Sequence, residues 1–311
     1  MKIDELLNYA LDSGASDLHL SVGSKPMVRI NGTMHPLNLE IMTKELMESI
    51  LPQVLSDEQV SKFRKEKEID FSAKMDGKGR FRVNFFSQLN GIAGVFRTIP
   101  DIIKSFEDLG IPPILKDLCL RNRGLILLTG PTGSGKSTTL ATMVDHINEN
   151  RSCHIITIED PVEYFHSSNS SLINQRELGA NTHSFSNALR AALREDPDVI
   201  LVGEMRDLET TSLSLTAAET GHLVMSTLHT SSAVKAIDRV IDIYPEGQKT
   251  QVRSMMSESL VAVIAQKLLP TRDGKGRVPA CEVMIATTAI RNLIREDRIY
   301  QIPSLMQSGG V

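Results

Sequence analysis

Residues 130–138 read GPTGSGKST and contain the complete pattern G-x-x-x-x-G-K-[ST]. An apolar run precedes them, and the residues that follow carry one apolar stripe at helical spacing. In such a strand–loop–helix unit, backbone N–H groups and the dipole of the helix bind nucleotide phosphates. We expect Lys136 to reach the β- and γ-phosphates of ATP and the Ser137 hydroxyl to ligate Mg²⁺. The predicted nucleotide-binding residues are Gly130, Pro131, Thr132, Gly133, Ser134, Gly135, Lys136, Ser137 and Thr138.

The sequence around this loop alternates short apolar runs with helical stretches. The runs are GLILLTG (124–130), HIITIED (154–160), DVILVGEM (198–205) and HLVMSTLHT (222–230). Strands that alternate with helices predict an α/β fold, in which helices cover both faces of a parallel sheet. Ligands bind such a sheet outside the carboxyl ends of its strands, so the residues that end each run are candidates for the site.

Acidic residues stand at the ends of two of these runs. Glu204 follows the apolar run Val199–Val202, and we assign it to Mg²⁺, partly through water. Glu159 ends another run, and Glu163 follows it after Pro161. Either of these two carboxylates is placed to orient an attacking water, and the spacing alone does not choose between them.

Two histidines bracket the last run. Seven residues of extended chain put His222 and His229 near opposite ends and on opposite faces of a strand, which argues against a shared metal site. His229 lies at the carboxyl end and is the stronger candidate for the site. His222 is explained equally well as a structural residue.

The chain is expected to contain two domains, because 311 residues exceed the usual size of one core. Residues 1–100 predict a small α+β domain, with helices near 3–11, 43–51 and 56–66 and several segments of period-two alternation. Residues 101–122 are rich in proline and are expected to be a linker with one short helix. Residues 123–311 then form the nucleotide-binding domain.

Arginines alternate with apolar residues in GRFRVNFF (79–86). The alternation puts Arg80, Arg82 and Asn84 on one strand face and phenylalanines on the other. If Asn90-Gly91 closes a two-residue hairpin, Arg97 is a diagonal neighbour of Arg82 on the same face. Such a pair is placed to meet the phosphates of another subunit, although a solvated polar face explains the pattern as readily. In the second half, Arg206 stands beside Asp207, which is its candidate partner.

The composition weakens other classes of function. The net charge is −4, and residues 1–100 carry 13 basic and 13 acidic side chains, so neither part is basic as a duplex-DNA binder would be. No apolar run approaches the ~20 residues of a membrane span, so direct membrane insertion is not expected. The N-terminus has no apolar signal core, and Cys119, Cys153 and Cys281 have no metal-binding spacing. A cytoplasmic protein with reduced thiols is therefore expected.

Four segments together resemble a known family. They are GPTGSGKST, IITIEDPVEY, LREDPDVILVGEMRD and TGHLVMSTLHT, and they match the Walker A, Asp, Walker B and His boxes of the secretion ATPases of the type II/type IV pilus superfamily. ASDLHL and the GRFRVNFF and VFRTIP pair also match. AIRNLIRE (289–296) resembles a helix typical of the pilus retraction branch. The resemblance covers essentially the whole chain.

This resemblance implies a ring, usually a hexamer, built from a PAS-like first domain and a RecA-like ATPase domain. It favours Glu163 as the catalytic glutamate, and it implies that Arg82 and Arg97 reach nucleotide while His222 and His229 sense it. The implied activity is ATP hydrolysis that powers type IV pilus retraction, and hence twitching motility, through an inner-membrane platform protein. The ring would dock at the cytoplasmic face of the inner membrane.

Family members usually continue through about one more helix, so the C-terminal part is expected to be short for the family. One alternative within the superfamily is an extension or type II secretion ATPase, which usually has a larger N-terminal region and often a four-cysteine metal site. A RecA-like nucleic-acid motor is a second alternative, disfavoured by the charge and by the scarcity of aromatic residues. A third alternative binds nucleotide without turnover.

We predict that Lys136→Ala abolishes ATP hydrolysis, because the β- and γ-phosphates lose their charged partner while the loop itself remains. Phosphate release measured on a variant with a native circular dichroism spectrum tests this. Near-wild-type turnover in that folded variant would contradict the assignment of the loop.

Overall fold

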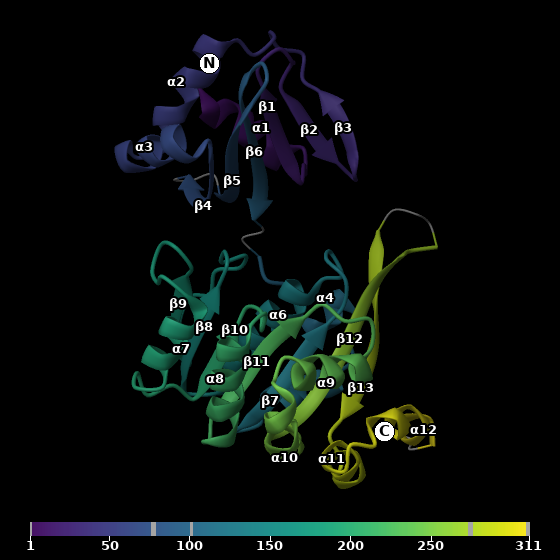
Figure 1. The fold of residues 1–311 in the computed structure, drawn as a ribbon. Coiled ribbons are helices and arrows are strands. Elements are labelled where there is room, and N and C mark those ends of the chain that lie inside the picture. The colour runs from purple at the N-terminus through teal and green to yellow at the C-terminus, as the bar shows by residue number, and fades with distance from the viewer. Residues whose placement is uncertain (1, 76–78, 100–101, 273–275, 309–311) are drawn as a thin grey trace. The chain divides into compact units, whose positions relative to one another are not determined.

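The computed structural model describes residues 2–75, 79–99, 102–272 and 276–308 of the chain. These residues form two compact units, Met1–Ile102 and Ile103–Val311, which are described separately (Figure 1). Each unit has a β-sheet and a hydrophobic core of its own.

The described residues of the first unit form a six-stranded antiparallel sheet in the order β3-β2-β1-β6-β5-β4. The strands are β1 (Asp17–Ser21), β2 (Met27–Ile30), β3 (Thr33–Pro36), β4 (Glu68–Met75), β5 (Gly79–Gln88) and β6 (Gly91–Ile99). The helices are α1 (Ile3–Asp12), α2 (Lys44–Val54) and α3 (Asp57–Glu66). The predicted α+β character of this part is therefore present.

The core of the first unit lies on one face of this sheet. Phe81, Val83 and Phe85 alternate with arginines along β5 and are fully buried, as the sequence pattern predicts. The rings of Phe85 and Phe96 meet edge to face with their centroids 5.6 Å apart. The polar residues of β5 consequently share the other face of the sheet.

The predicted register of the β5–β6 hairpin was wrong by two residues. Gln88 pairs with Gly91, so the turn residues are Leu89 and Asn90, and Arg82 lies directly opposite Arg97. The reason is packing on the apolar face. This register sets Gly94 opposite Phe85, whose ring occupies the space of a side chain, since a Cβ on Gly94 would lie 2.7 Å from it.

The described residues of the second unit form a seven-stranded sheet in the order β13-β12-β7-β11-β10-β8-β9. The strands are β7 (Gly124–Thr129), β8 (His154–Glu159), β9 (Leu172–Glu177), β10 (Val199–Val202), β11 (Leu223–Leu228), β12 (Leu260–Pro270) and β13 (Arg277–Ile285). The helices are α4 (Phe106–Leu109), α5 (Ile114–Cys119), α6 (Lys136–Asn150), α7 (Phe185–Ala192), α8 (Leu208–Glu219), α9 (Ala233–Asp242), α10 (Lys249–Ser259), α11 (Thr288–Arg295) and α12 (Ile302–Ser308), with 3₁₀ turns η1 (Glu246–Gln248) and η2 (Ile299–Gln301).

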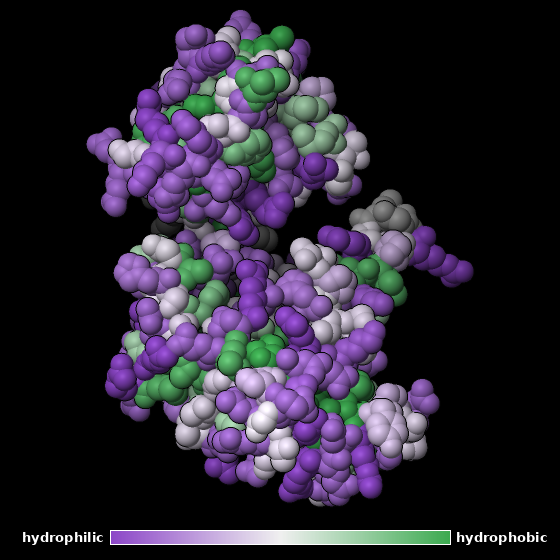
Figure 2. Space-filling model, in the orientation of Figure 1, coloured by the Kyte–Doolittle hydropathy of each residue, from purple (hydrophilic) through white to green (hydrophobic). Residues whose placement is uncertain are grey.

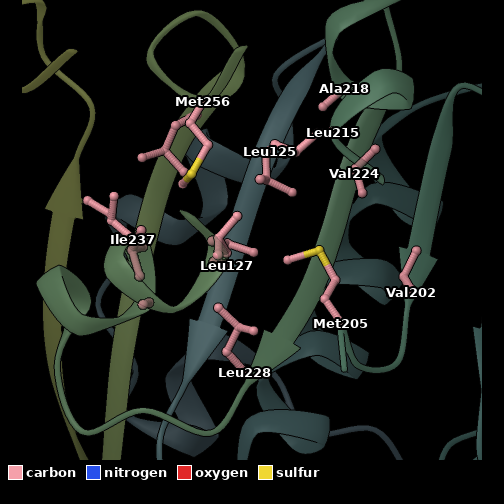
Figure 3. Packing of buried hydrophobic residues seen from close by; sticks show 14 of the residues in the cluster. Leu125, Leu127, Val202, Met205, Leu215, Ala218, Val224, Leu228, Ile237 and Met256 are labelled. Atoms are coloured by element: carbon pink, nitrogen blue, oxygen red, sulfur yellow. The ribbon is translucent and has the colours of Figure 1, made fainter. Parts of the chain in front are cut away.

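All the pairs in this sheet are parallel except β12 with β13, which confirms the predicted α/β fold with a mostly parallel sheet. Every residue of β7 is buried, and its side chains alternate between two cores. Leu125 and Leu127 pack with α8 and α9, as Figure 3 shows, whereas Ile126 and Leu128 pack with α5 and α6. Helices therefore cover both faces.

The segment predicted as a linker is instead part of the second unit. It contains two short helices, α4 and α5, and its apolar residues Phe106, Ile111 and Leu115 are buried in the core that also holds Ile126. Proline spacing suggested a linker, but the apolar side chains between the prolines gain more by covering the sheet than by facing water.

Figure 2 shows mostly hydrophilic residues on the displayed face of each unit, with smaller apolar groups among them. Within the described part of the chain, no helix has both the length and the apolar character needed to cross a membrane.

Candidate functional site

The phosphate loop joins β7 to α6 at the carboxyl edge of the sheet. Gly130 and Gly135 have φ values of 148° and 86°, which residues with a side chain rarely adopt. Gly135 is also the N-cap of α6 and has no side chain to accept from the first N–H groups of the helix. Those donors are therefore available to an anion at this end of α6.

The side chain of Lys136 folds back onto the phosphate loop. Its Nζ donates to the carbonyl oxygens of Gly130 at 2.9 Å and Pro131 at 3.1 Å, and the residue is only 8% exposed. Burial lowers the pKa of Lys136, and the carboxylates of Glu204 and Glu163 oppose that shift. Lys136 thus lies within the electrostatic reach of Glu204 and of Glu163, the glutamate that the family resemblance favours.

The strand order explains why these groups converge. β7 lies beside β11, β11 beside β10, and β10 beside β8, so their carboxyl ends meet along one edge (Figure 1). Thr129 Oγ1 accepts from the Thr230 N–H at 2.8 Å and lies 2.8 Å from Thr230 Oγ1. These contacts fix the end of β11 against the start of the phosphate loop.

Glu204 follows β10 and is held from two sides. Arg206 Nε donates to its Oε2 at 2.7 Å, and His229 Nε2 lies 3.4 Å from the same oxygen. The expected pairing of Arg206 with Asp207 was wrong. Asp207 is the N-cap of α8, where its Oδ1 accepts from the Thr210 N–H, so this carboxylate is already engaged.

The two remaining carboxylates of the site have different surroundings. Glu159 accepts from Thr157 Oγ1 at 2.6 Å, from Gln175 Nε2 at 3.4 Å and from the backbone N–H of Glu163. Glu163 itself is exposed. Glu159 therefore stabilises the loop after β8 by hydrogen bonds, whereas the side chain of Glu163 lies at the protein surface and is accessible to water.

Two residues that the sequence reasoning missed also hold this loop. Gln175 on β9 donates to the Tyr164 carbonyl at 2.8 Å and accepts from the His166 N–H at 2.9 Å. The Tyr164 hydroxyl lies 2.9 Å from Thr138 Oγ1 at the start of α6. The segment that carries Glu163 is thus linked to the phosphate loop by side chains, a link that only the fold reveals.

His222 does not join the group. It precedes β11 at the amino edge of the sheet, and its Nδ1 lies 2.9 Å from the Ala217 carbonyl oxygen, while His229 follows the strand at the edge of the phosphate loop. Six buried strand residues separate the two histidines, or about 20 Å of extended chain. Within one subunit only His229 is near Glu204.

In the first unit, Arg82 and Arg97 face each other across β5 and β6, and each has an acidic partner. Arg82 donates to Asp70 at 2.6 Å, and Arg97 donates to Asp17 at 2.9 Å. Asp17 is 5% exposed, and its pKa is lowered because hydrogen bonds from Ser16 and Arg97 outweigh its burial. The acids offset the repulsion between the two guanidinium groups.

The oxygen donors at the loop fit the Mg²⁺ that accompanies ATP. The half-buried Ser137 follows Lys136, and the Glu204 carboxylate lies at the same carboxyl edge of the sheet. A hydroxyl and a carboxylate are the hard-oxygen donors that this ion prefers. Among the residues the structure describes, no group of three or more His, Cys, Asp and Glu is arranged to hold a metal ion. Nucleotide phosphates would have to complete the coordination.

Burial raises the pKa of Glu159 to about 7 from its ordinary 4.5, despite the hydrogen bonds that lower it. The folded state therefore retains a proton that the unfolded state releases, and stability falls as the pH rises from 4.5 through 7. We predict that Glu159→Gln, which cannot ionise, gains up to about 3 kcal/mol over the wild type at pH 8.5 and much less at pH 5.5.

Thermal unfolding at both pH values measures this difference, with the exposed Glu149→Gln as the matched control. A gain for Glu159→Gln that is equal at the two pH values would show that ionisation of Glu159 is not its cause.

Comparison with known proteins agrees with this site. The family described as Type II/IV secretion system protein matches residues 1–304. The type IV pilus retraction ATPase PilT of Pseudomonas aeruginosa is 53% identical over 310 residues, covering 100% of this chain and 90% of the relative. A twitching motility protein of Neisseria gonorrhoeae is 55% identical over 91% of this chain and 76% of its own length.

A crystal structure of the pilus retraction motor PilT with bound ADP superposes with a TM-score of 0.95 at 51% identity, covering 99% of this chain and 90% of that one. The chain belongs to the Type II/IV secretion system protein family, as a close relative of the retraction ATPases within it.

Proposed function

We propose that this chain is an ATP-hydrolysing motor that powers type IV pilus retraction, the basis of twitching motility. The observation that carries the proposal is the convergence of Lys136, Glu204 and Glu163 on one edge of the sheet. The agreement of the whole chain with retraction ATPases supports it.

ATP would bind with its phosphates against the N–H groups at the start of α6. Lys136 would then exchange the Gly130 and Pro131 carbonyls for the β- and γ-phosphates. Ser137 and Glu204 would hold Mg²⁺, which when bound neutralises charge on the phosphate oxygens. Pro131, Thr132 and Gly133 form the exposed part of the loop over the phosphates.

Glu163 is our candidate for the water-orienting base. Water attacks the γ-phosphorus, the bond from that phosphorus to the bridging oxygen of ADP breaks, and Glu163 accepts the proton of the water. The exposed position of Glu163 suits this role better than that of Glu159, which is half-buried and hydrogen-bonded to the loop. His229 would respond to nucleotide through its contact with Glu204.

A single phosphate loop does not concentrate enough positive charge for fast transfer of the γ-phosphoryl group, and an arginine supplied in trans can add a factor of about 10³–10⁵. We assign this role to Arg82 and Arg97, whose shared face makes the first unit a source of two guanidinium groups. At least one of them would act on the nucleotide of a neighbouring subunit. The working form is then a homo-oligomeric ring, with six subunits expected.

In this role the ring would dock at the cytoplasmic face of the inner membrane and act on a platform protein of the pilus machine. His222, at the other edge of the sheet from the phosphate loop, would in that case respond to nucleotide only through a contact between subunits. Nucleic acid is not an expected partner, because the net charge of the chain is −4.

Substitutions of Glu163 and Glu204 should have different effects on binding and hydrolysis. We predict that Glu163→Gln binds Mg·ATP but lowers hydrolysis by about 100-fold or more, because the water loses its acceptor, while Glu204→Ala weakens the dependence of nucleotide binding on Mg²⁺. Nucleotide retained after gel filtration and phosphate release distinguish these outcomes. Trapped ATP in Glu159→Gln together with normal turnover in Glu163→Gln would reverse our choice of base.

The arginines predict complementation between subunits. Arg97→Ala should lose hydrolysis by about 10³-fold yet keep most of its ATP affinity, and mixing it with Lys136→Ala subunits should restore part of the activity. An intact Lys136 loop in one subunit would then use Arg97 of its neighbour. If mixed rings form by native mass spectrometry and remain inactive, the trans arrangement is wrong.

A further inference from the structure

One buried polar side chain beside the phosphate loop has no part in the mechanism above. Gln266 lies on β12, which runs parallel to β7 (Figure 1). It is one residue beyond Ala265, the partner of Thr129, and so lies next to Gly130. It is 2% exposed, although it is polar, and the residues before it on β12 are all apolar. A buried amide must find hydrogen-bond partners, and those of Gln266 are in the loop.

The Gln266 amide makes two hydrogen bonds to the loop and α6. Its Nε2 donates to the Ser134 carbonyl at 2.8 Å, and its Oε1 accepts from Thr139 Oγ1 at 2.9 Å. On the far side, Cys281 Sγ lies 3.8 Å from the same Oε1. One planar group thus fixes the last turn of the loop against the first turn of α6.

Two glycines of the loop lie directly against Gln266, Gly130 against its backbone and Gly135 against its side chain. A Cβ on Gly130 would lie 2.2 Å from the Gln266 carbonyl oxygen, and a Cβ on Gly135 would lie 2.9 Å from its Nε2. The loop rests directly on this residue of β12. The glycines of the motif therefore serve packing against Gln266 as well as the approach of phosphate.

The bond to Ser134 also sets the direction of a phosphate donor. In a trans peptide the C=O of Ser134 and the N–H of Gly135 point in opposite directions. Because Gln266 on β12 donates to the Ser134 carbonyl, the Gly135 N–H is turned away from β12, on the side where it can donate to a phosphate. We propose that Gln266 is a positioning residue of the nucleotide site, which preorganises the loop for phosphate through Ser134 and Thr139.

This inference rests on the proposed nucleotide site, and it predicts a loss of affinity in preference to a loss of catalysis. A misdirected N–H weakens ground state and transition state alike, so KM rises while kcat changes little. We expect Gln266→Met, which keeps the volume and removes both hydrogen bonds, to raise the Kd for Mg·ADP and the KM for ATP about 10–100-fold. Its kcat should remain within about threefold of the wild type.

Gln266→Glu distinguishes a hydrogen-bonding role of this residue from a role in packing, because only the hydrogen-bonding role predicts a dependence on pH. A neutral carboxylic acid donates to Ser134 and accepts from Thr139 as the amide does, whereas a carboxylate cannot donate and repels phosphate. Burial raises the pKa of a carboxyl group placed here. The ADP affinity of Gln266→Glu, divided by that of the wild type, should therefore rise at least tenfold between pH 8.5 and pH 6, whereas the ratio for Gln266→Met should stay flat.

Among the residues that the structure describes, Cys281 on β13 contacts Gln266, and the charged residues Lys104, Asp108 and Arg277 line a cavity of about 290 Å³ together with Gln266. These groups are unchanged in every variant, so a difference in pH dependence between Gln266→Glu and Gln266→Met arises from the carboxyl group at position 266. The exposed Gln251→Met is the matched control and should bind ADP as the wild type does. Thr139→Val, which removes one of the two bonds, should fall between the wild type and Gln266→Met.

Isothermal titration with Mg·ADP measures binding independently of turnover and assembly. If the wild type binds ADP without hydrolysing ATP, the proposed function fails while the test of Gln266 stands. Wild-type affinity in folded Gln266→Met, or a flat pH ratio for Gln266→Glu, overturns the positioning role. If Gln266→Met does not fold, the pH ratio of Gln266→Glu alone decides.

Discussion

The start of α6 is the constraint on which the site depends. Other helices of the second unit begin with a side chain that accepts from their first turn: Ser184 for α7, Asp207 for α8 and Ser232 for α9. α6 begins at Gly135, which has no side chain to accept from them, so its first N–H groups remain available to an anion from outside the protein. The parallel sheet then determines which side chains meet that anion, because its strand ends share one edge.

Much of this arrangement could be predicted from the sequence. The glycine pattern of residues 130–138 identified the loop, and the apolar runs around Leu125, Ile156, Ile200 and Val224 identified four buried strands of the sheet, because length and apolar continuity are strong local signals. The separation of His222 from the loop also followed from strand geometry.

Other features depend on contacts between distant segments, and local patterns do not encode them. The hairpin register depended on how Phe85 packs over Gly94, which outweighed the turn preference of Asn90-Gly91. The sequence pattern did not indicate a role for Gln266, because a glutamine that follows an apolar run is usually expected to face solvent. The hydrogen bonds of Gln175 to the loop after β8 likewise depend on the pairing of β9 with β8, which the sequence does not predict.

The self-bonded lysine of the loop has a thermodynamic consequence. Lys136 already donates to two carbonyl oxygens, so in the proposed site nucleotide binding would exchange these acceptors for phosphate oxygens, and the affinity would be a difference between two sets of hydrogen bonds. Burial lowers the pKa of this lysine, and the negative charge of a bound phosphate would raise it. Binding is therefore coupled to proton uptake at alkaline pH, and the heat of binding there depends on the ionisation enthalpy of the buffer.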